Sequence, residues 1–131
     1  MWQFFDSGLF CFFAVLSKPV LDFNDIIRLC AAAADFVSLL YTALGMGNEN
    51  LSITLEILHP EKLKIASGDT PYPFAAHQPC RASFESFAAA IAKNPAEYAA
   101  NLASDIGNLY NLNGLDAEHL KIAAGKHLEK K

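Results

Sequence analysis

Basic residues are few in this chain. Its 131 residues include ten Lys or Arg against 14 Asp or Glu, which gives a formal net charge of −4. Proteins that bind nucleic acid without sequence preference neutralise phosphates with clustered Lys and Arg. Several of the ten stand in the C-terminal tail, so the sequence predicts no direct binding of DNA or RNA. The charged fraction of 18% is below the roughly 25% of an average soluble domain, which favours a face covered by a partner.

Cysteine and recognisable site motifs are also scarce. Cys11, Cys30 and Cys80 lie in apolar surroundings and are too few for a disulfide framework, so we expect small core residues and a cytoplasmic location. His77-x-x-Cys80 has metal-ligand spacing, but a structural zinc site needs a second such pair. Gly45-Met46-Gly47 follows a predicted helix and cannot present phosphate to a helix N-terminus. The sequence therefore predicts no metal, no cofactor and no catalytic residue.

The N-terminal segment lacks the features of a secretory leader. It has no basic region before the apolar run Leu9 to Leu16, and Asp6 and Gly8 interrupt the apolar stretch. That run is also far shorter than the ~20 residues that span a bilayer. We interpret it as a strand, with no membrane partner, and keep a secretory leader as the less favoured alternative.

Aromatic residues are concentrated in this same segment. Trp2 to Phe5 and Leu9 to Leu16 flank Asp6-Ser7-Gly8, a pattern typical of a β-hairpin. Because the run Leu9 to Leu16 is apolar at every position, such a strand would be apolar on both faces and would need cover on each. The residues that we expect to serve packing or an interface are Trp2, Phe4, Phe10, Phe12 and Phe13.

The rest of the chain predicts a single α+β domain over residues 1–131. Apolar residues at spacings of three and four predict a helix from Asp22 or Asn24 to about Leu44, with Ile26, Cys30, Ala33, Val37, Leu40 and Leu44 facing the core. The further expected elements are a strand over 51–57, a short strand over 63–66 pairing back on it, a loop over 68–79, and helices beginning near Ser83, Pro95 and Leu115. The predicted order is β-β-α-β-β-α-α-α, with helices packed on a small, mainly antiparallel sheet.

Three segments together resemble a known arrangement. The first is the hairpin Trp2 to Phe10. The second is the helix that ends with Asp35 to Gly45, followed by the strand Leu51 to Ile57. The third runs from a Ser-Phe-Glu stretch through Asn94-Pro95-Ala96-Glu97 to a helix with Leu109-Tyr110. This order is similar to the region that follows the Schlafen-type AlbA-like domain in prokaryotic putative ATP-binding or transcription-regulator proteins. The resemblance implies an accessory domain beside a nucleotide- or nucleic-acid-linked one. It carries no site residues over to this chain.

Three hypotheses of function follow. The first is a non-catalytic protein-interaction or dimerisation domain of a cytoplasmic bacterial protein, whose partner is a second copy or a neighbouring domain. The second is a small acidic partner-binding protein of the immunity-protein or secretion-chaperone type. The third is a ligand-binding sensor with an aromatic-lined pocket, for which the polar candidates are His59, His77, Arg81 and Glu85.

Overall fold

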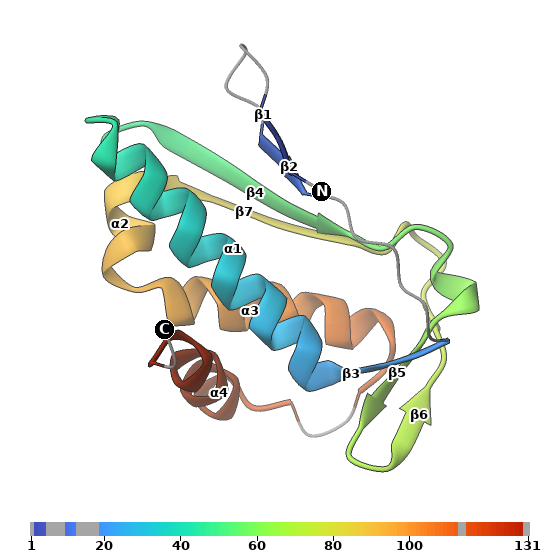
Figure 1. Ribbon diagram of the computed structural model, residues 1–131. Coiled ribbons are helices and arrows are strands. Elements are labelled where there is room, and N and C mark those ends of the chain that lie inside the picture. The colour runs from blue at the N-terminus through green and yellow to red at the C-terminus, as the bar shows by residue number, and fades with distance from the viewer. Residues whose placement is uncertain (1, 5–9, 13–18, 113–114, 130–131) are drawn as a thin grey trace.

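Helix α1 (Phe23–Ala43) runs the length of the molecule and organises the rest of the fold (Figure 1). The computed structural model describes residues 2–4, 10–12, 19–112 and 115–129. Asp22 caps the start of α1, where its side chain accepts a hydrogen bond from the Asn24 N–H at 2.9 Å. The helix ends before Gly45, whose φ of +76° suits glycine. The predicted bounds of this helix are confirmed.

Three further helices follow in the second half of the chain, α2 (Ala88–Lys93), α3 (Pro95–Leu109) and α4 (Ala117–Glu129). Pro95 occupies the first turn of α3, where its missing N–H costs no hydrogen bond. α1 packs against all three, and α3 also packs against α4. The predicted helices near Pro95 and Leu115 are confirmed.

The strands form three small sheets. β1 (Trp2–Phe4) pairs with β2 (Phe10–Phe12), and β4 (Asn50–Glu56) pairs with β7 (Arg81–Phe87), both antiparallel. In the third sheet β5 (Lys64–Ser67) lies between β3 (Val20–Asp22), to which it is parallel, and the antiparallel β6 (Thr70–Tyr72). A 3₁₀ turn, η1 (Pro60–Lys62), precedes β5. The predicted α+β class with mainly antiparallel pairing is confirmed.

Helices α1 and α3 cover the inner face of the β4–β7 sheet, α1 against β4 and α3 against β7. Residues of the two strands alternate between this face and solvent, so Leu51 and Ala82 are buried while Ser52 and Ser83 are exposed. A larger core joins α1, α3, α4 and β5, and a smaller one lies around Tyr41 at the other end of α1.

The predicted helix beginning near Ser83 was wrong, because residues 81–87 form a strand. Its spacing of Phe84, Phe87 and Ala88 fits a helix, yet Ala82 and Phe84 also alternate with the polar Arg81, Ser83 and Glu85. Pairing with β4 along seven residue pairs, from Asn50↔Phe87 to Glu56↔Arg81, decides in favour of the strand. The helix begins only at Ala88.

Two predictions about segment 63–79 were also wrong. The short strand does not pair back on β4, because β5 pairs with β3 and β6. Residues 70–72, which we expected in a loop, form β6, and Pro71 stands opposite Ala66. Proline is tolerated there because β6 is an edge strand of the described sheet.

The buried face of α1 differs from the predicted stripe in the second half of the helix. Ile26 and Cys30 are buried as expected, but further along the buried positions are Ala34, Ser38 and Tyr41. Leu44, expected in the core, is 59% exposed. Ser38 is fully buried because its hydroxyl donates to the Asp35 carbonyl at 3.1 Å, which satisfies its polar group within the helix.

α1 also has the length and composition of a membrane-crossing helix, with a mean hydropathy of 1.6 over its most apolar window. A core helix passes the same test. Eight of the 21 residues of α1 are buried against the rest of the described protein, while its apolar residues Phe36 and Leu39 are exposed.

Candidate interaction site

The aromatic residues of the N-terminal hairpin stand opposite one another in the β1–β2 ladder. Trp2 pairs with Phe12 and Phe4 with Phe10, while Gln3 pairs with Cys11 between them. Alternate positions of a pleated ladder belong to one face, so the register places the four aromatic residues on the same face. The predicted antiparallel pairing is confirmed for residues 2–4 and 10–12, whereas the predicted turn over 6–8 and the rest of the second strand, to Leu16, lie outside the described residues. Phe13, the fifth predicted interface residue, lies outside the described residues.

This ladder is a sheet of its own. Within the part of the chain that the structure describes, no other strand pairs with β1 or β2, and Figure 1 shows the hairpin at the edge of the molecule beyond β4. A two-stranded hairpin alone is marginally stable in water and needs a further strand or an apolar surface to pack against. We therefore expect the stability of the hairpin to depend on a further strand or an apolar surface that packs against it.

A second apolar region lies where α1 ends and α2 begins. Leu44 and Phe87 are 59% and 58% exposed, and Met46 is 39% exposed. The Ala88 N–H donates to the Glu49 carbonyl and the Ala89 N–H to the Gly47 carbonyl, and these hydrogen bonds hold the loop after α1 against the start of α2. These contacts gather three large apolar side chains, Leu44, Met46 and Phe87, at one end of the molecule.

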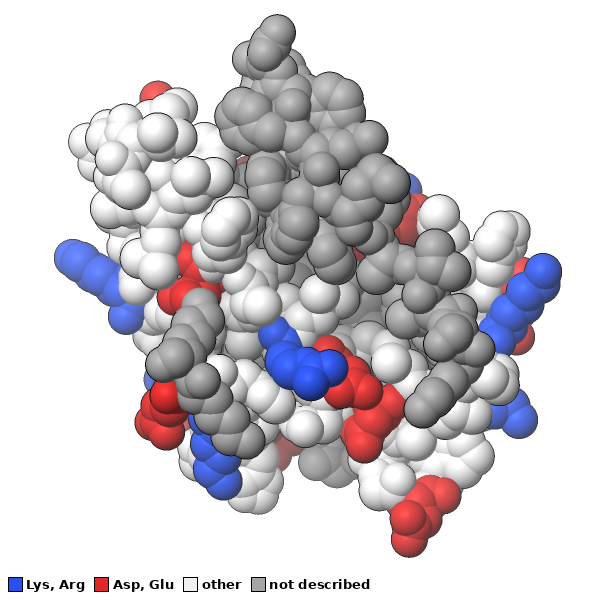
Figure 2. Space-filling model, in the orientation of Figure 1, with Lys and Arg blue, Asp and Glu red and all other residues white. Residues whose placement is uncertain are grey.

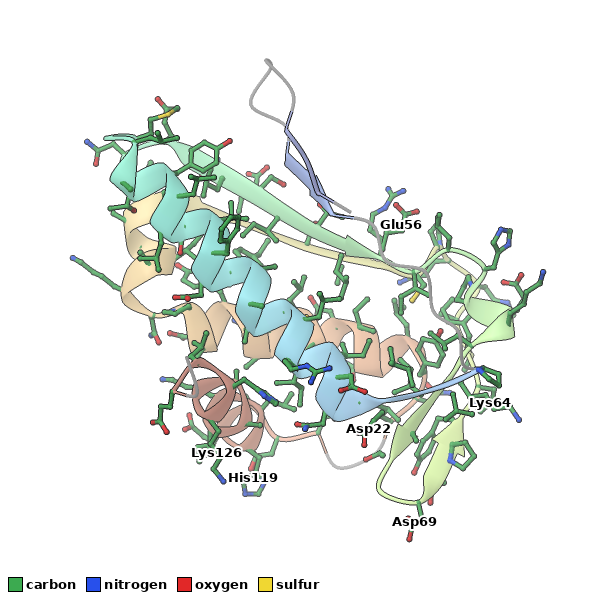
Figure 3. The ribbon with its side chains drawn as sticks, viewed as in Figure 1. Asp22, Glu56, Lys64, Asp69, His119 and Lys126 are labelled. Atoms are coloured by element: carbon green, nitrogen blue, oxygen red, sulfur yellow. The ribbon has the colours of Figure 1, made fainter. Side chains whose placement is uncertain are left out.

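The outer face of the β4–β7 sheet is exposed and, apart from Phe87 at its end, polar. Glu56 stands opposite Arg81, and their side chains form an ion pair at 3.3 Å; Figure 3 shows Glu56 at the end of β4. Ser52 stands opposite Glu85, and Thr54 opposite Ser83. This face carries charged and hydroxyl groups without burying any of them.

The edge of β7 with which no described strand pairs borders an open groove of about 360 Å³. Arg81, Ala82 and Ser83 line it from the strand, and Asp105, Asn108 and Leu109 from the end of α3. Sequence reasoning missed this groove because it placed a helix where β7 lies. Alternation of Ala82 and Phe84 with the polar Arg81, Ser83 and Glu85 was the signal that could have indicated the strand.

The groove does not match the aromatic-lined pocket of the sensor hypothesis. Of the four polar candidates only Arg81 lines it. His59 is exposed beside Glu61 at 3.6 Å, and His77 and Glu85 are exposed elsewhere. The structure therefore does not bring these four residues together around this groove.

The two described cysteines are buried thiols. Burial raises the pKa of Cys30 to about 12. Burial also raises the pKa of Cys80 to about 11, although hydrogen bonds with the Ile57 backbone and the Tyr110 hydroxyl act against it. Because a thiolate is the reactive form, these two thiols are poor nucleophiles at neutral pH. His77 is exposed while Cys80 is buried, and the described residues contain no cluster of three His, Cys, Asp or Glu that could hold a metal ion.

Acidic and basic side chains are interspersed over the face seen in Figure 2, and the described residues form no continuous patch of one sign there. The net charge of −4 is therefore not gathered on this face.

Comparisons with protein-family models, with curated proteins and with solved structures find no match for this chain.

Proposed function

We propose that this protein is a non-catalytic protein-interaction or dimerisation domain, and that the β1–β2 hairpin is its docking element. The observation that carries the proposal is the register of this hairpin, which sets Trp2 opposite Phe12 and Phe4 opposite Phe10 in a ladder that no other described strand extends. Aromatic residues contribute large contact areas in interfaces at a low cost in conformational entropy.

Two further observations support an interaction role. The apolar end formed by Leu44, Met46 and Phe87 adds exposed apolar surface, and such surface often marks interaction sites. Cys30 and Cys80, the two thiols that the structure describes, are buried and protonated at neutral pH, so neither supplies a nucleophile. In this proposal the protein acts in the bacterial cytoplasm, with a second copy or a neighbouring domain as its partner. A domain of the Schlafen-associated AlbA-like type would be such a neighbour.

The test uses Trp2, which is the single tryptophan of the chain and stands in β1. If the hairpin is the docking element, we expect the mass from light scattering to rise with protein concentration and the Trp2 emission to shift to shorter wavelength in step with it. Phe12→Asp places a charge opposite Trp2 and should abolish the emission shift and the part of the mass increase that the hairpin causes, while the helical circular dichroism persists.

Gln3→Asp is the matched control, because it introduces the same charge in the same hairpin at the other face of the ladder. This variant should associate like the unmodified protein. Unchanged mass and emission in Phe12→Asp would contradict the assignment of the hairpin as the docking element.

A further inference from the structure

The free edge of β7 is a second surface, separate from the hairpin. β7 pairs with β4 along one edge, and no described strand pairs with its other edge (Figure 1). A strand with one open edge presents a row of unpaired backbone groups that another strand can complete.

The hydrogen-bond pattern identifies which backbone groups face this edge. Ile57 donates to the Cys80 carbonyl and Ala88 to the Glu49 carbonyl, at 2.9 and 3.0 Å. In an antiparallel ladder directly bonded positions recur every second residue. The even-numbered residues of β7 therefore bond to β4, and Ser83 and Glu85 direct their N–H and C=O groups to the open edge.

In one antiparallel register of two β7 strands, the charged residues of one strand stand opposite residues of the opposite charge on the other. If two β7 strands pair about a two-fold axis through Ser83, Arg81 of each copy stands opposite Glu85 of the other. Both side chains are exposed on the outer face, where opposite charges in directly opposed positions are stabilising. Registers centred on Arg81 or on Glu85 instead oppose like charges.

The remaining contacts of this register are also compatible with pairing. The two Ser83 residues would exchange both backbone hydrogen bonds, and each Glu85 N–H would donate to the Arg81 carbonyl. The Arg81 N–H already donates to Pro79 at 2.9 Å and is not required. On the inner face Ala82 would stand opposite the half-buried Phe84 of the second copy, beside the open groove of about 360 Å³.

We propose that a second copy of this chain occupies the β7 edge, which joins two β4–β7 sheets into one four-stranded sheet about a two-fold axis at Ser83. Across its outer face Arg81 would lie between Glu56 of its own chain, already 3.3 Å away, and Glu85 of the other copy. Closed two-fold association completes both edges at once and leaves no β7 edge for further growth.

A charge exchange tests the proposal. Glu85→Arg and Arg81→Glu each oppose like charges in the β7 homodimer, so each variant alone should lose the β7-mediated dimer and show a lower mass by light scattering than the unmodified protein at the same concentration. An equimolar mixture of the two variants restores both opposite-charge pairs and should recover the mass of the unmodified protein. Glu118→Arg makes the same charge change on the exposed surface of α4 and should leave the dimer intact.

A backbone variant separates edge pairing from association through side chains alone. Ser83→Pro removes an N–H that the new ladder uses and that β4 does not, so it should prevent formation of the β7-mediated dimer while retaining the circular dichroism of the fold. The charge-exchange pair keeps the test valid if proline itself disturbs β7.

Failure of this inference is distinct from failure of the proposed function. A dimer that resists both charge variants but is lost in Phe12→Asp would overturn the β7 assignment and support the hairpin. A monomer at every concentration, or two variants whose mass does not rise when they are mixed, would also overturn it.

Discussion

Gly107 provides a sharp test of the packing between α1 and α3. A Cβ atom at this position would lie 2.7 Å from Leu115 Cδ1 and 3.2 Å from two ring carbons of Phe23. Contacts below 3.0 Å force a neighbour to move, and Phe23 is only 6% exposed, so its ring has little room. The Leu115 methyl group is the end of a flexible, half-buried side chain and can turn aside, so the buried Phe23 ring at 3.2 Å sets the cost of the methyl group that Gly107→Ala adds.

Two effects of opposite sign determine the size of the change. Overpacking a core typically costs about 1–3 kcal/mol, while alanine in place of glycine inside a helix contributes about 1 kcal/mol of stability. We expect a net loss of about 1 kcal/mol in the free energy of unfolding, which lowers the Tm by about 3–5 °C in a domain of this size. Chemical denaturation followed by circular dichroism measures it.

Gly125 in α4 is the matched control. Nothing lies within 4 Å of a Cβ atom built there, so only the helix-propensity term acts. Gly125→Ala should stabilise the protein by about 0.5–1 kcal/mol. Equal effects of the two substitutions would show that the close approach at Gly107 is absent.

A double-mutant cycle assigns the cause. Phe23→Leu removes the two ring carbons that the new methyl group would meet, so Gly107→Ala should be less destabilising in that background by about 0.5 kcal/mol or more. Additive effects would refute the reasoning.

Two further predictions concern the buried thiols and the start of α1. In a Cys11→Ser background, Cys30 and Cys80 should not react with a thiol reagent at pH 8 until denaturant unfolds the protein. Burial raises the pKa of Cys30 to about 12 and that of Cys80 to about 11, from an ordinary 9.0. Because the unfolded state therefore loses its thiol protons at lower pH than the folded state, the free energy of unfolding should fall as the pH rises above about 9. Reaction at the rate of a free thiol in the native protein would contradict this. Asp22→Ala removes the acceptor of the Asn24 N–H (Figure 3) and should cost about 1 kcal/mol in chemical denaturation, whereas Asp22→Asn should retain most of the stability.

The local sequence predicted the elements whose signals are local. α1 has a capping Asp22 and a glycine after its end, α3 starts at Pro95, and β4 alternates apolar and polar residues over Leu51 to Ile57. The hairpin was predicted for the same reason, because its turn residues and its aromatic strands are neighbours in the chain. Each of these patterns specifies backbone conformation within a short window.

Tertiary structure alone decided which strands pair and which face of α1 is buried. Segment 81–87 satisfies a helical spacing as well as a strand alternation, and its pairing with β4, some 30 residues earlier, selects the strand. β5 pairs in parallel with β3, which precedes α1 in the chain, and no local sequence pattern predicts this pairing. The open β7 edge, its neighbouring groove and the self-complementary positions of Arg81 and Glu85 exist only once this pairing is made, because a sheet edge is a property of contacts between distant segments.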